Sequence, residues 1–107
     1  MRRINFFNQK EIKNELTLKD GFEKFINHKM ALSKADETIK YYAHRLAKFS
    51  LYIEETTAIK YVHEITEDNI NSYILYLRNK NPNISNVTIN NHLRAIRCAL
   101  YYFMEKG

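Results

Sequence analysis

The stretch DETIKYYAHRLAKFSLYI, from Asp36 to Ile53, decides the fold class. Its apolar residues follow one another at steps of three and four, the spacing of one face of an α-helix. They are Ile39, Tyr42, Leu46, Phe49 and Ile53. Acidic residues favour the positive end of a helix, and Asp36 is suited to cap it. The stretch therefore predicts a helix that begins at Asp36 and fades over residues 54–57.

Three further stretches have the same period. Thr17 can cap the start of a helix that ends near Ser33. Thr66 can cap the start of another helix, which ends at the turn of residues 79–83. A last helix opens at Ser85 or Asn86, with Gly107 placed to end it. The residues expected to face the core are Leu18, Phe22, Phe25, Ile26 and Met30 in the first, Ile70, Tyr73, Ile74 and Leu77 in the second, and Ile89, Leu93, Ile96, Leu100 and Phe103 in the third.

Four helices with short connections predict an all-α bundle over residues 17–107, with residues 1–16 as a tail or lead-in. The 107-residue chain has two Gly and one Pro, too few for the tight turns of a β-sandwich. No apolar run approaches the about 18 residues that cross a membrane. Cys98 is the single cysteine, which excludes an internal disulfide and a cysteine-based zinc cluster. We expect a cytoplasmic protein.

Basic residues lie on one side of two of these helices. Seventeen Lys and Arg against twelve Asp and Glu give a net charge of +5. Lys40, His44 and Lys48 form a stripe at i, i+4 and i+8, opposite the apolar one. Arg94 and Arg97 lie on the outer face of the last helix, and residues 69–104 contain no acid. We expect both basic sides to face the same way, so that one DNA duplex lies against both.

The starts of these two helices also resemble each other: Asp36-Glu37-Thr38-Ile39 against Asn86-Val87-Thr88-Ile89. A hydroxyl in the first turn, beside unpaired N–H groups, is well placed to take a DNA phosphate. Taken alone, each Thr is better explained as an ordinary cap, and each basic stripe as a solvated face. The pairing of the two features is what favours nucleic acid.

Catalytic chemistry is not visible in the chain. It has no Gly-rich phosphate loop, no nucleophile motif and no pair of histidines at metal-ligand spacing. The four histidines lie on separate segments, which favours structural or surface roles. We expect no metal, no cofactor and no enzymatic activity.

One pattern of apolar and capping residues runs through the body of the chain. It comprises Leu16-Thr17-Leu18, Phe22, Phe25, Leu32-Ser33, Thr38-Ile39, Tyr42, Leu46, Phe49, Ile65-Thr66, Ile70, Tyr73, Leu77, the run Ser85 to Asn90, Leu93, Ile96-Arg97, Tyr101 and Phe103. This pattern, over residues 16–107, resembles the core-binding domain of tyrosine recombinases of the phage integrase type. It implies a SAM-like four-helix domain that clamps a recombination half-site, its second and fourth helices crossing the major groove. The residues then expected to contact DNA are Thr38, Lys40, His44, Arg45, Lys48, Thr88, Asn90, Asn91, Arg94 and Arg97.

In that family the catalytic tyrosine lies in a separate C-terminal domain, so no tyrosine here is expected to be a nucleophile. The chain stops where a linker to such a domain would begin, as expected of one domain of a larger recombinase. The implied partners are double-stranded DNA and, through the full-length protein, other recombinase protomers; the isolated domain is expected to be a monomer. The alternative is a helical protein-interaction module that uses the same basic face. A small enzyme is disfavoured by the missing motifs.

Overall fold

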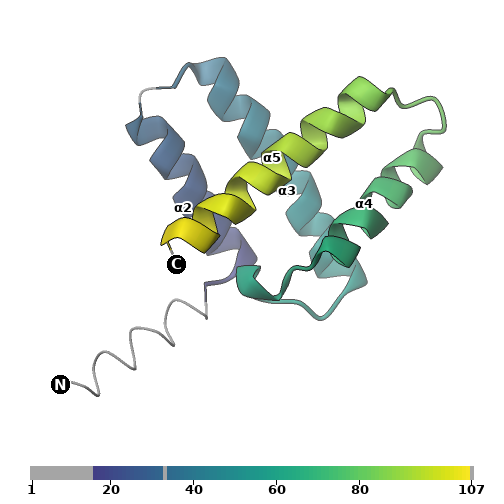
Figure 1. Ribbon diagram of the computed structural model, residues 1–107, viewed down its shortest axis with the longest axis horizontal. Helices are drawn as coiled ribbons and strands as arrows, with labels where there is room; N and C mark the ends of the chain where they lie inside the picture. Colours follow the sequence, from purple (N-terminus) through teal and green to yellow (C-terminus); the bar gives the residue numbers. More distant parts are fainter. Residues whose placement is uncertain (1–15, 33, 107) are drawn as a thin grey trace.

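The computed structural model describes residues 16–32 and 34–106 (Figure 1). They form helices α2 (Leu18–Ala31), α3 (Asp36–Thr56), α4 (Glu67–Lys80) and α5 (Asn86–Lys106), with a 3-10 turn, η1 (Val62–Glu64), before α4. The predicted all-α class and four helices are confirmed. The predicted tail, apart from Leu16, and the predicted glycine stop at residue 107 lie outside the described residues. No described helix is long and apolar enough to cross a membrane.

Side chains fix the starts of α2 and α4 as predicted. Thr17 Oγ1 accepts a hydrogen bond from the Asp20 N–H at 3.2 Å. Thr66 caps α4, and Asn69 returns the bond because its Oδ1 accepts from the Thr66 N–H at 2.8 Å. The predicted cap of α3 is wrong: Ala35 is the N-cap, no side chain caps it, and Asp36 is the first helical residue. Asp36 therefore acts on the helix dipole, not on a particular N–H.

Helix α3 lies at the centre of the fold, in contact with α2, α4 and α5. Figure 1 shows α5 crossing α3, with α2 and α4 beside them. Phe49, completely buried, joins two neighbours: its ring lies 6.4 Å from that of Phe22 in α2 and 5.2 Å from that of Tyr73 in α4. Such aromatic pairs add specific geometry to the burial that drives folding.

One residue predicted for the core faces solvent. Met30 is 57% exposed. The apolar face of α2 continues from Phe25 to Lys29 instead, and the Lys29 ammonium lies 5.4 Å from the ring centres of both Phe25 and Tyr42. A long lysine stem can cover apolar surface while its charge stays in water. The apolar pattern alone therefore placed the wrong residue at this position.

The irregular segment before α4 is tied to the start of α2. Val62 donates its N–H to the Leu16 carbonyl at 2.9 Å, and the Leu18 N–H donates to the Lys60 carbonyl at 3.1 Å. Leu16, which we placed at the end of the predicted tail, also packs against the core. A Cβ on Gly21 would lie 2.7 Å from Val62 Cγ1. Gly21 is thus explained by close packing against Val62, which offsets its cost inside a helix.

Candidate nucleic-acid interface

Helices α3 and α5 begin along the same edge of the molecule, the upper edge in Figure 1. We call residues 36–45 of α3 and 86–94 of α5 the N-terminal edge. The two halves are joined by Tyr41, whose hydroxyl donates to the Asn91 carbonyl at 3.0 Å and lies 3.4 Å from Asn91 Oδ1. This contact across fifty residues of sequence brings two predicted DNA-binding segments together.

Arg45 is held against the same contact. Its guanidinium carbon lies 4.2 Å from the centre of the Tyr41 ring, and its Nη1 donates to the Tyr41 carbonyl at 3.2 Å. A cation stacked on an aromatic ring keeps its charge while losing freedom of motion. Arg45 is therefore a positive charge with a fixed position, which suits recognition of an anion.

The two threonines have different surroundings, although both are half-buried. The Thr88 N–H donates to Ser85 Oγ at 3.1 Å, and the two hydroxyl oxygens lie 3.0 Å apart. Thr88 is thus part of the cap of α5. The first turn of α3 holds Asp36 and Glu37, whereas the first turn of α5 holds no acid. Only the α5 start offers a polyanion an acid-free helix end.

The predicted basic residues of α3 are exposed, with the exception of Arg45. Lys40, His44 and Lys48 lie opposite the buried face of Leu46 and Phe49, as the stripe predicted. On α5, Asn90 and Arg94 are exposed, and Asn91 is half-buried by Tyr41. These side chains are available to a ligand without rearrangement of the core.

Arg97 is not free on the outer face. Its Nη2 lies 3.0 Å from Glu67 Oε2 at the start of α4, in the one ion pair of the described residues. The partner is thirty positions away in sequence, so the helical pattern of α5 could not reveal it. That Arg97 contacts DNA stays a prediction; in the structure a carboxylate opposes its charge.

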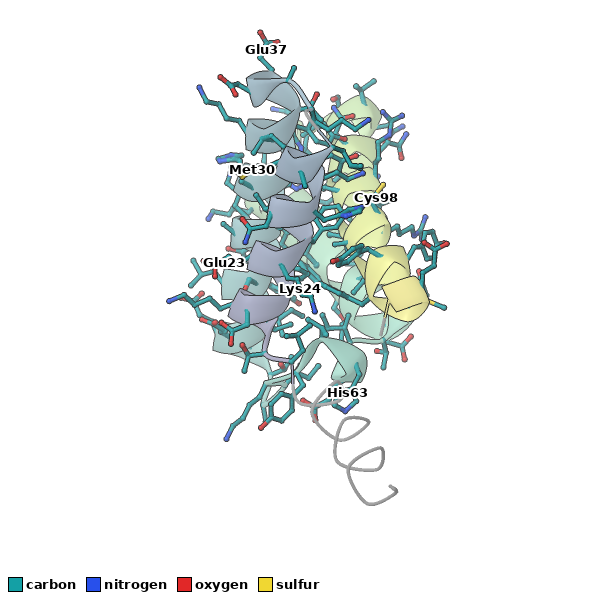
Figure 2. The ribbon with its side chains drawn as sticks, turned by 90° about the vertical axis from the view of Figure 1, so that its left-hand side faces the viewer. Glu23, Lys24, Met30, Glu37, His63 and Cys98 are labelled. Atoms are coloured by element: carbon teal, nitrogen blue, oxygen red, sulfur yellow. The ribbon has the colours of Figure 1, made fainter. Side chains whose placement is uncertain are left out.

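The basic outer faces of α3 and α5 point away from each other, which differs from the shared face that we expected. The two helices pack through their buried faces, so their solvent faces diverge; Figure 2 shows α5 on one side and α3 on the other. Lys48 lines a groove with residues of α4, whereas Arg94 is exposed and does not line that groove. What the two helices share is their N-terminal edge, not a flat surface.

His92 is a buried polar residue that the sequence pattern missed. It is 7% exposed, and its ring lies 5.9 Å from that of Tyr73, edge to face. Burial first, and then the charges of Arg45, Lys48 and His44, lower the pKa of the His92 imidazole. The ring is therefore neutral at pH 7 and adds no charge to the interface. No described group of His, Cys, Asp and Glu could hold a metal ion.

A family model described as the phage integrase N-terminal SAM-like domain matches residues 22–106. Neither the curated proteins nor the solved structures include a match to the chain. The matched region runs from within α2 to the end of α5 and includes the whole N-terminal edge.

Proposed function

Because the chain belongs to the phage integrase N-terminal SAM-like domain family, we propose that it binds duplex DNA through the N-terminal edge. Domains of this family are in general not the catalytic part of a recombinase. The chain would act as one half of a clamp on a recombination half-site, with its helix starts directed at the major groove. Its partners would be double-stranded DNA in the cytoplasm and further protomers of the whole recombinase.

The observation that carries the proposal is the contact of Tyr41, Arg45 and Asn91. It links the first turns of two helices that are distant in sequence and holds a cation beside that link. Fixed cations neutralise phosphates, which supplies most of the affinity of a protein for DNA. The exposed Asn90 amide and the Arg94 guanidinium are of the kinds that read base edges in the major groove.

Gel retardation of a duplex, with matched charge reversals, tests the proposal. Arg94→Glu and Lys24→Glu change the net charge equally, but Lys24 lies on α2, far from Glu37 and the N-terminal edge (Figure 2). We expect the chain to retard DNA at low salt and Arg94→Glu to weaken binding at least about tenfold more than Lys24→Glu. Equal losses would mean that only net charge matters. Absence of retardation by the unaltered chain would favour the protein-interaction module.

A further inference from the structure

A groove between α3, α4 and the start of α5 has a composition different from that of the N-terminal edge. Its wall is aromatic: the Tyr52 ring lies 5.0 Å from that of Tyr76 and 5.1 Å from that of Tyr73. Leu51, which is 54% exposed, continues the wall on α3. Exposed apolar groups that gather at a groove mark a contact surface, because their hydration is unfavourable.

Two buried polar atoms of the groove residues are without a hydrogen-bond partner in the described part of the chain. They are the Tyr73 hydroxyl, on a side chain that is 1% exposed, and Nδ1 of His92. A buried polar atom that is left unpaired costs free energy. The Tyr73 hydroxyl keeps its proton at neutral pH, since burial raises its pKa to about 12. Both atoms lie beneath the surface of the groove, so they are not themselves contacts for a ligand in it.

Lysines flank this aromatic wall. Lys48 lines the groove from α3, and Lys80 lines it from α4, where its Nζ donates to the Tyr76 hydroxyl at 3.3 Å and lies 5.6 Å from the ring centre. One acid, Glu55, also lines the groove. Two cations beside an apolar wall complement a segment with both a carboxylate and a large apolar side chain. The Glu55 carboxylate would repel a nucleic-acid backbone in this groove, because such a backbone carries a negative charge on every phosphate.

We propose that this groove binds a short acidic peptide segment of a partner protein, with one aromatic or large aliphatic side chain against Tyr52 and Tyr76 and a carboxylate between Lys48 and Lys80. The proposal goes beyond DNA binding and uses a groove that meets the N-terminal edge only at the start of α5. Lys48 and Thr88 belong both to the groove and to the residues predicted to contact DNA. A bound peptide and a bound duplex would therefore hinder each other.

Amide chemical shifts of the nitrogen-15-labelled chain test the proposal. The probe is a capped glutamate-phenylalanine-glutamate tripeptide, with lysine-phenylalanine-lysine and glutamate-alanine-glutamate as controls. We expect the acidic aromatic peptide to shift amides of Leu51, Tyr76 and Ser85, and both controls to bind more weakly. Tyr76→Ala should weaken binding at least about tenfold, as for an aromatic anchor, and Lys80→Glu about two- to fivefold.

Lys24→Glu is the control variant, since it makes the same charge change away from the groove and should leave binding unchanged. Equal shifts with the lysine peptide, shifts outside the groove or no shifts at saturating peptide would overturn the proposal. If a duplex shifts the groove amides and the peptide does not, the groove belongs to the DNA surface and the peptide proposal is wrong. A chain that binds the peptide but no duplex would contradict only the proposed DNA binding.

Discussion

The starts of α3 and α5 have related sequences, yet they are built differently. At α5, Ser85 caps the helix, the first turn is free of acids, and Arg78 donates to Asn86 Oδ1 at 3.1 Å. At α3, Ala35 supplies no side-chain cap, and Asp36 and Glu37 stand in the first turn. A neutral cap satisfies N–H groups without opposing an anion, whereas acids stabilise the helix dipole and repel a phosphate.

This difference indicates unequal roles at the N-terminal edge. If the proposed DNA binding is right, the α5 start would be the stronger site for a phosphate, because its first turn is acid-free. The α3 start contributes its cations further along the helix, at Lys40 and Arg45, beyond its own acids. A similar first-turn sequence therefore does not give a similar electrostatic site.

An exchange of the first turns should have the largest effect. Asn86→Asp with Val87→Glu gives α5 the acidic start of α3, and we expect DNA affinity to fall more than about tenfold at low salt. Asp36→Asn with Glu37→Val makes the reverse change and should raise affinity. Fluorescence anisotropy with a labelled duplex measures both. If both exchanges change DNA affinity in the same direction, the acids of the first turns do not explain the difference between the two helix starts.

The side-chain cap of α5 and the missing cap of α3 should also affect the stability of the domain differently. Ser85→Ala removes the hydroxyl that accepts from the Thr88 N–H and should lower the free energy of unfolding by about 1 kcal/mol. Ala35→Ser introduces a cap where none exists and should raise it by up to about 1 kcal/mol. Urea unfolding followed by circular dichroism measures both changes. If Ser85→Ala left the free energy of unfolding unchanged, the cap would contribute nothing to stability.

The link between the two starts should contribute somewhat less. Tyr41→Phe keeps the ring beneath Arg45 but removes the hydroxyl that donates to Asn91. The free energy of unfolding should therefore fall by about 0.5–1 kcal/mol. Tyr101→Phe is the matched control, because Tyr101 is 59% exposed and should leave stability unchanged. Equal effects of the two variants in urea unfolding would contradict a specific role for the Tyr41 contact.

The ion pair of Arg97 and Glu67 should have the smallest effect. Its side chains are 43% and 64% exposed, so water screens the attraction. A double-mutant cycle with Arg97→Ala and Glu67→Ala should give a coupling of about 0.5 kcal/mol or less. A much larger coupling would mean that this pair, and not the Tyr41 contact, sets how α5 lies in the fold.

The sequence was sufficient for features that repeat along one helix. The stripe from Ile39 to Ile53 gave α3 its length and its buried face, and Thr17 and Thr66 gave two helix starts. Features that depend on a distant partner could not be predicted. Gly21 is explained only by Val62, which lies in an irregular segment without periodicity.

The candidate site follows the same division. Exposure of Lys40, His44 and Lys48 follows from their spacing within α3 and was predicted. The direction of one basic face relative to another depends on how α5 crosses α3, and no pattern within either helix encodes it. The burial of His92 likewise depends on packing against Tyr73 of α4.

The central claim is that DNA meets the edge where α3 and α5 begin, and not the outer faces along their whole length. Photo-crosslinking to a duplex, from single cysteines in a Cys98→Ser background, tests it most directly. Lys40→Cys and Asn90→Cys place the probe near the N-terminal ends of α3 and α5. Glu54→Cys and Met104→Cys place it on exposed positions near the C-terminal ends of the same two helices. We predict crosslinks from the first pair and none above background from the second. Equal yields from all four positions would contradict the account.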